Sequence, residues 1–168
     1  YYADDVVAES NDITSTDVGI QLFTGNSHRY VNNMVKGGSD RGFFLNNVDN
    51  VTMLHNSIFG NPGFEHQSGS SEGLTFRNNI FASENDFGFE TNGIDSADIV
   101  ALDYNIYYSV NGSPVEFDLV TYDTLANLQA AATYANTNSI FGDPLFNSAT
   151  DLHITFGLIA DSAGTPVG

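Results

Sequence analysis

The feature that most constrains the fold is a short repeat that runs through the first two thirds of the chain. A polar segment that contains Asn and ends in an apolar residue recurs at intervals of 21, 24, 22 and 26 residues. Its apolar position holds Ile13, Met34, Ile58, Ile80 and Ile106, and the position before it holds Asp12, Asn33, Ser57, Asn79 and Asn105. A second column follows a glycine in each of the first four repeats: Ile20, Phe43, Phe64 and Phe89. Two columns that recur at similar intervals indicate a repeat protein.

Each repeat predicts short β-strands separated by turns rich in Gly, Asn and Ser. A unit of about 22 residues made of short strands cannot bury its apolar face alone, so successive units must stack and share one core. This predicts an all-β solenoid in which equivalent side chains lie about 4.8 Å apart. The repeat places one buried column at Ile13 and its equivalents, and a second column of aromatic rings at Phe43, Phe64 and Phe89. Amides in a third column would hydrogen-bond from unit to unit: Asn33, Asn79 and Asn105.

These columns resemble those of the right-handed parallel β-helix family, the pectate-lyase-like architecture of many secreted bacterial proteins. A second group of segments near the C-terminus is similar to the closing part of such proteins: 103–108, 122–129, 139–146 and 151–154. The resemblance implies a right-handed parallel β-helix of about five rungs and a secreted or cell-surface bacterial location. It does not imply one activity, because this fold carries lyases, hydrolases, epimerases and adhesins.

The C-terminal third departs from the strand pattern. Apolar residues at helical spacing predict one short helix over about 123–135, with Asp123 at its N-terminus. We expect residues 1–106 to form the rungs and residues 107–168 to form a cap over the open end of the core, within one continuous domain. The first residues show no such cap and no signal-peptide pattern. We therefore expect the chain to be part of a longer protein, with upstream residues or another subunit packed on the first rung.

The charge of the chain argues against several classes of partner. Four Lys and Arg residues stand against 21 Asp and Glu residues, which gives a formal net charge of −17. Binding to a phosphate backbone needs clustered cations, so nucleic acid and anionic membrane surfaces are not expected partners. No apolar run approaches the roughly 20 residues of a membrane helix, so membrane insertion is not expected. The absence of cysteine excludes disulfides and cysteine-ligated metals.

Two pairs of residues are candidates for catalysis on acidic polysaccharides, the substrates that the resemblance implies. Lys36 and Arg41 share one Gly-rich turn and are similar in type to the Lys/Arg pair of some polysaccharide lyases, which combine a base with a stabilising cation. Glu65 and Glu90 both follow Gly-Phe, so adjacent rungs would bring their carboxylates near the separation of about 5–5.5 Å found in retaining glycosidases. The alternative interpretations are local salt bridges and a solvated face.

Oxygen-bearing side chains stand two places before each glycine of the second column: Asp17, Asp40, Asn61 and Asp86. Stacked carboxylate and amide oxygens suit Ca²⁺, and like charges on adjacent rungs would favour a counter-ion. Calcium is therefore the candidate cofactor. Tight turns also select Asp and Asn, so a role in the turns alone is the alternative.

A short pattern of Asp, then Ser or Thr, then a small or apolar residue is similar to an O-glycosylation site of secreted proteins in one large group of Gram-negative bacteria. It occurs three times and predicts sugar on Ser96, Thr124 and Ser162.

Together these observations favour a non-catalytic β-helix module of a large secreted or cell-surface bacterial protein, used as a stalk, for adhesion or for binding carbohydrate. The first alternative is the C-terminal part of a polysaccharide lyase or glycoside hydrolase that acts on acidic glycans. The second is a filament or fibre subunit that stacks through its first rung. A polysaccharide or a cell-surface glycan is the expected partner.

Overall fold

Short strands dominate the computed structural model, which describes residues 3–67, 71–95, 97–132, 135–148 and 150–154. The strands of the first half are β1 (Val7–Glu9), β2 (Asp12–Thr14), β3 (Ile20–Val31), β4 (Met34–Lys36), β5 (Phe43–Leu54), β6 (Ser57–Gly60), β7 (Phe64–His66), β8 (Leu74–Arg77) and β9 (Ile80–Ser83). Those of the second half are β10 (Phe89–Thr91), β11 (Ile99–Asp103), β12 (Ile106–Ser109), β13 (Val115–Phe117), β14 (Val120–Tyr122), β15 (Ile140–Phe141), β16 (Phe146–Ser148) and β17 (Asp151–Ile154). One helix, α1 (Leu125–Ala131), completes the described residues. The all-β prediction is confirmed.

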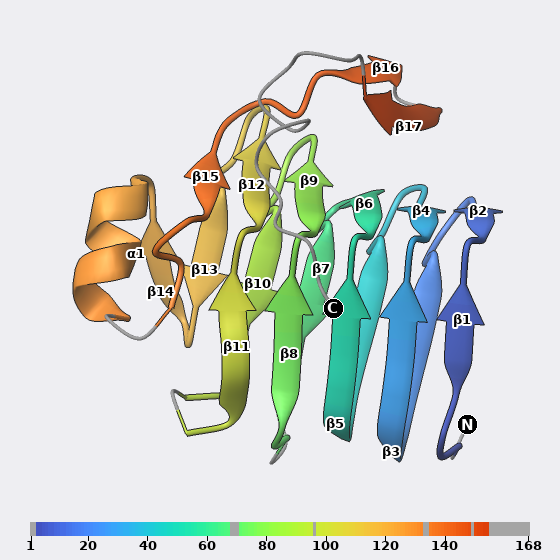
Figure 1. Ribbon diagram of the computed structural model, residues 1–168. Helices are drawn as coiled ribbons and strands as arrows, with labels where there is room; N and C mark the ends of the chain where they lie inside the picture. The colour runs from blue at the N-terminus through green and yellow to red at the C-terminus, as the bar shows by residue number, and fades with distance from the viewer. Residues whose placement is uncertain (1–2, 68–70, 96, 133–134, 149, 155–168) are drawn as a thin grey trace.

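The strands stack into a solenoid of about five turns (Figure 1). In each turn the chain runs along a nine-stranded sheet and then along a six-stranded sheet, whose order is β15-β12-β9-β6-β4-β2. The long strand β5 pairs with both β7 and β8, so the path that one long strand follows is divided between two strands in the next turn. Pairings between successive turns are parallel, as the repeat predicts.

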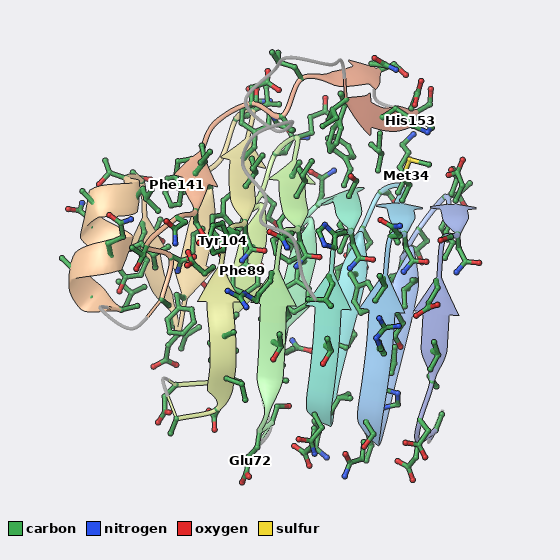
Figure 2. All side chains as sticks on the ribbon, viewed as in Figure 1. Met34, Glu72, Phe89, Tyr104, Phe141 and His153 are labelled. Atoms are coloured by element: carbon green, nitrogen blue, oxygen red, sulfur yellow. The ribbon has the colours of Figure 1, made fainter. Side chains whose placement is uncertain are left out.

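Aromatic side chains that stack from rung to rung fill the interior. Phe43, Phe64 and Phe89 occupy equivalent positions in β5, β7 and β10, and all three are buried. The rings of Phe64 and Phe89 lie nearly parallel, with centroids 4.8 Å apart, which is the spacing of neighbouring strands in a sheet. Figure 2 shows Phe89 inside the space that the sheets enclose. Neighbouring rungs therefore share one core.

A ladder of buried asparagine amides runs beside this aromatic stack: Asn33, Asn56, Asn79 and Asn105. Each of the four directly follows a turn residue whose backbone is left-handed, with φ between 56° and 58°: Asn32, His55, Asn78 and Tyr104. These turns carry the chain from the nine-stranded sheet to the six-stranded sheet. The ladder therefore sits at the same corner of every rung.

The amide of Asn79 shows how one step of the ladder is built. Its Oδ1 atom accepts hydrogen bonds from the backbone N–H of Asn56 at 3.0 Å and from Asn56 Nδ2 at 2.9 Å. Its Nδ2 atom donates to the carbonyl oxygen of Met53 at 2.9 Å and to Oδ1 of Asn105 at 3.2 Å. Asn33 and Asn56 are linked in the same way. Each amide thus pairs a turn N–H that would otherwise be buried without a partner.

The register of the six-stranded sheet differs from the predicted one. Met34 pairs with Ser57 rather than Ile58, and Ile13 pairs with Val35 rather than Met34. The inward column is Ile13, Val35, Ile58, Phe81, Tyr107 and Phe141. The predicted column was wrong because it mixed residues of two neighbouring columns: Ile13, Met34, Ile58, Ile80 and Ile106. The column beside the inward one holds Asp12, Met34, Ser57, Ile80, Ile106 and Ile140. The same shift explains why Asn56, and not Ser57, belongs to the ladder. It also explains why the exposed Asn11, and not Asp12, extends the ladder at its N-terminal end.

The helix α1 closes the C-terminal end of the core and is shorter than the predicted range 123–135. Its N-cap is Thr124 and not Asp123, because the Thr124 hydroxyl accepts a hydrogen bond from the backbone N–H of Asn127 at 3.3 Å. Leu128 of α1 and the residue that ends it, Ala132, are buried in the main hydrophobic cluster. Within the described residues, no helix has both the length and the apolar character needed to cross a membrane.

The antiparallel hairpin of β16 and β17 packs on the outside of the rungs instead of over their end. Phe146 and Ile154 of this hairpin contact a second apolar cluster formed by Ile80 and Ile106 on the outer side of the six-stranded sheet. The hairpin reaches back over earlier rungs, where β17 contacts β6 (Figure 1). Figure 2 shows His153 of β17 above Met34 of β4.

At the opposite end of the solenoid, β1 and β2 are the outermost strands of the two large sheets. Packing of upstream residues or of another subunit against them stays a prediction.

Removing one amide from the middle of the ladder tests how strongly the ladder supports the fold. Asn79→Ala removes the acceptor of the Asn56 backbone N–H, one of the two acceptors of Asn56 Nδ2, and the amide donor to the carbonyl of Met53. Each buried polar group that loses its partner costs about 1–3 kcal/mol, so we expect the free energy of unfolding to fall by about 3 kcal/mol or more in urea denaturation.

Asn11→Ala is the matched control. Asn11 is exposed and stands at the end of the ladder, where it donates to Oδ1 of Asn33 at 2.9 Å. Its removal should cost about 0.5 kcal/mol or less. Equal losses in the two variants would contradict a special role for the buried amides.

Candidate functional site

A row of carboxylates follows the outer face of the nine-stranded sheet. Equivalent outward positions in successive rungs hold Gln21, Phe44, Glu65, Glu90 and Glu116. We call the last three residues the acid row. Stacked parallel strands bring equivalent residues about 4.8 Å apart, so the acid row is a line of three closely spaced carboxylates. Glu116 was missed from the sequence because Pro114 stands where the earlier rungs have a glycine, although the alternation of Val115, Glu116 and Phe117 repeats theirs.

Arg41 supplies the positive charge at the Glu65 end of the acid row. Its guanidinium makes ion pairs with the carboxylates of Glu65 and Asp40, the second at 2.9 Å. It also lies 4.7 Å from the centroid of the Phe44 ring, which adds a cation–π contact. Glu65 is only 7% exposed. A buried carboxylate needs such a partner, so Arg41 and Glu65 form a closed pair.

Glu90, the middle residue of the acid row, has no ion pair within the described residues. Its partial burial, followed by the charges of Glu65, Asp86 and Glu116, raises its pKa to about 7 from the ordinary value of 4.5, and Arg41 offsets part of this. Burial and the charge of Asp86 raise the pKa of Glu116 as well. The acid row therefore holds a proton near neutral pH.

The two members of the predicted lyase pair, Lys36 and Arg41, make different contacts. Lys36 is the last residue of β4 and pairs in register with Phe59 of β6. It has no ion pair in the part of the chain that the structure describes, whereas Arg41 contacts Glu65 and Asp40. The one basic residue joined to the acid row is thus already neutralised.

The parallel, in-register stacking of rungs decides the fold. The chain is a right-handed parallel β-helix. Residues 1–81 match the family model described as "Right handed beta helix region". This match covers just under half of the 168 residues, and the structure continues the same architecture beyond it to β12 and β15. The searches of curated proteins and of solved structures gave no match.

Side-chain oxygen atoms of three residues in the predicted calcium row make ion pairs or hydrogen bonds within the β-helix. Asp40 pairs with Arg41, and Oδ1 of Asn61 accepts hydrogen bonds from the hydroxyl of Ser83 and from two backbone N–H groups. Asp86 accepts from the N–H of Phe87 at 2.9 Å. Asp17 lies exposed in the turn before β3. Among the described residues, no three His, Asp or Glu side chains form a group that could hold a metal.

Calcium binding at this row stays a prediction with a direct measurement. A cation held between turns of successive rungs stabilises only the folded state, so the melting temperature should rise when calcium is added to the chelator-treated protein. Magnesium at the same concentration is the control, because it demands a tighter geometry. Equal melting temperatures with calcium and with chelator would contradict the site.

The predicted glycosylation sites differ in what can be said of them. Thr124 is exposed, and its hydroxyl is the N-cap of α1. Ser96 and Ser162 lie outside the described residues. Sugar on these three residues stays a prediction.

The raised pKa of Glu90 predicts how the stability of the β-helix varies with pH. The folded protein holds this proton more tightly than the unfolded chain, whose glutamates titrate near 4.5. The stabilisation is complete below that pH and is lost as the pH rises through about 7. We expect the melting temperature to fall between about pH 5 and about pH 8.

Glu90→Gln should reduce this slope, because the amide does not titrate. Glu72→Gln, at an exposed turn seen at the lower edge of Figure 2, should leave the slope unchanged. An unchanged slope in Glu90→Gln would show that other groups cause the pH dependence.

Proposed function

We propose that this β-helix is a non-catalytic module of a large secreted or cell-surface bacterial protein and that it binds carbohydrate through its surface. The observation that carries the proposal is the closed pair of Arg41 and Glu65. A lyase needs a free cation beside its base, and a retaining hydrolase needs two carboxylates that reach the substrate. Here the cation of the acid row is paired, and the carboxylate that would act as nucleophile is buried.

The architecture also suits a rigid carrier. The amide ladder and the aromatic stack run continuously through the rungs, so the faces of the β-helix keep a fixed geometry. Rigid elements hold binding groups more accurately than loops do. A net charge of −17 favours solubility outside the cell and repels anionic glycans, so neutral or basic glycans are the expected ligands.

A glycoside hydrolase is the second candidate, and one observation favours it. Glu90 keeps a proton up to about pH 7, which is what a general acid requires. Its neighbour in register is Glu65, whose negative charge is stabilised by Arg41. A carboxyl that holds its proton thus stands beside a carboxylate that is ion-paired, which is an arrangement that acid–base catalysis can use.

Incubation of the purified chain with acidic and neutral polysaccharides separates the two candidates. We expect no new reducing ends and no ultraviolet absorbance from unsaturated products. We also expect the chain to bind at least one glycan on a glycan array. Products that disappear in Glu90→Gln but persist in Glu72→Gln would establish the hydrolase. Absence of binding to every glycan on the array would contradict the proposed module.

A further inference from the structure

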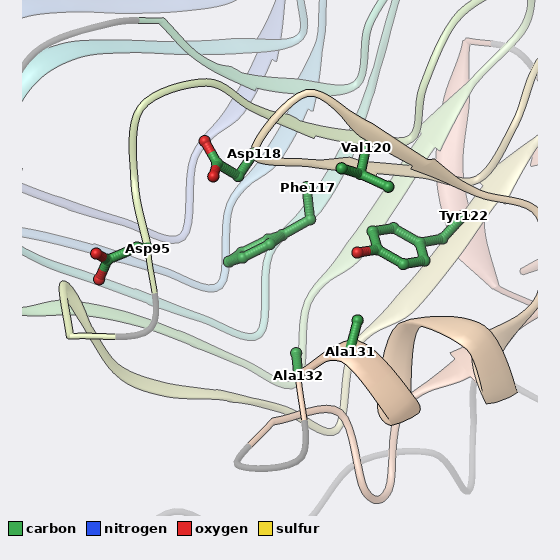
Figure 3. Close-up of a pocket in the computed structure, with 7 residues that line it drawn as sticks. All are labelled: Asp95, Phe117, Asp118, Val120, Tyr122, Ala131 and Ala132. Atoms are coloured by element: carbon green, nitrogen blue, oxygen red, sulfur yellow. The ribbon is translucent and has the colours of Figure 1, made fainter.

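A cavity of about 230 Å³ lies at the C-terminal end of the β-helix (Figure 3). The segment before β11, the β13–β14 hairpin and the end of α1 form its walls. Its lining residues are Asp95, Phe117, Asp118, Val120, Tyr122, Ala131 and Ala132. None of them belongs to the acid row, so the cavity is a separate candidate for binding.

The turn of the β13–β14 hairpin fixes the position of one acid at this cavity. Phe117 pairs with Val120, and the two residues between them, Asp118 and Leu119, both have left-handed backbone, with φ of 48° and 63°. Two such residues in succession make the tight turn that suits a two-residue hairpin. The N–H of Asp118 donates to Oγ1 of Thr91 in β10 at 3.1 Å, which ties the turn to the preceding rung.

The charged side chains among the described lining residues are both negative. Asp95 and Asp118 are exposed and line it from two different segments. Oδ1 of Asp95 accepts a hydrogen bond from the N–H of Ala97 at 2.6 Å, which orients this carboxylate. None of the described lining residues is basic. Two carboxylates without a cation between them attract a ligand that carries positive charge and hydrogen-bond donors.

The remaining walls are apolar and partly aromatic. The rings of Phe117 and Tyr122 face the cavity from the two strands of the hairpin, and Ala131 and Ala132 leave room opposite them (Figure 3). Val120, at 52% exposure, extends the apolar surface to the rim. Aromatic rings with a polar tip offer a flat surface to one face of a ligand and a hydrogen bond at its edge. The cavity is smaller than the roughly 300–1,000 Å³ that holds drug-sized ligands, which favours a single ring.

We infer that this cavity binds one sugar ring with a free amino group, a hexosamine unit of a basic glycan. The ammonium group pairs with the carboxylates of Asp95 and Asp118, which also accept hydrogen bonds from ring hydroxyls. The apolar face of the ring packs on Tyr122. This inference rests on the proposed carbohydrate binding and adds to it the ligand class and the place where the ligand binds.

Two glycans that differ only in the group on the amino nitrogen test the inference. Calorimetric titration with glucosamine oligomers is compared with titration with fully N-acetylated oligomers of the same length. A charged hydrogen bond contributes about 1.5–3 kcal/mol, so we expect the acetylated form to bind at least about tenfold more weakly. Asp118→Asn and Tyr122→Ala should each weaken binding of the free-amine oligomer by about tenfold.

Three controls separate the cavity from general attraction to an acidic protein. Asp12→Asn removes the same charge on exposed β2, at the opposite end of the solenoid, and this variant should bind as the unmodified chain does. Tyr122→Phe keeps the ring and should retain most of the affinity. Melting temperatures of all variants show that each of them is folded.

The outcomes distinguish this inference from the proposed function. Equal binding of the two oligomers, or unchanged binding in Asp118→Asn and Tyr122→Ala, overturns the hexosamine site while carbohydrate binding elsewhere still stands. Binding of a lysine homopolymer that is stronger than binding of the glucosamine oligomer, and that is lost in Asp118→Asn and Tyr122→Ala, overturns it in favour of a basic peptide. Failure to bind any glycan overturns both.

Discussion

The buried amide ladder is the constraint on which the rest of this β-helix depends. Turning a chain at the same corner of every rung leaves a backbone N–H inside the protein at each turn, and water cannot reach it. The side-chain oxygens of Asn33, Asn56 and Asn79 each accept a hydrogen bond from the turn N–H of the preceding rung. Since each amide depends on the next, the rungs must stay in register, and this register also places the outward side chains.

The acid row is a direct result of that register. Parallel in-register strands repeat any charged position at the strand spacing, so three glutamates in one column repel one another unless a cation or a proton intervenes. Arg41 neutralises the charge of Glu65, and a bound proton neutralises that of Glu90. The charges of Glu65 and Glu90 are thus compensated within the protein, whereas the described lining of the cavity beside β13 holds the carboxylates of Asp95 and Asp118 and no basic residue.

The repeat carries enough information to predict the solenoid, the aromatic column and the shared column of Glu65 and Glu90. It fails to predict the register of the six-stranded sheet, because asparagine stands both at the left-handed turn position and at the ladder position, as in Asn32 and Asn33 or Asn78 and Asn79. The pairing of Arg41 with Glu65 depends on how a long side chain crosses between rungs. The cavity arises from the non-repeating cap, where no column exists to guide alignment.

The β16–β17 hairpin changes how this solenoid responds to mechanical load. In a simple stack each rung touches only its neighbours, so a pull on one end can peel rungs away one at a time. This hairpin crosses several rungs, since it contacts β6 and packs on Ile80 of β9 and Ile106 of β12. The hairpin thus contacts three successive turns, so peeling away any one of them also breaks its contacts with the hairpin.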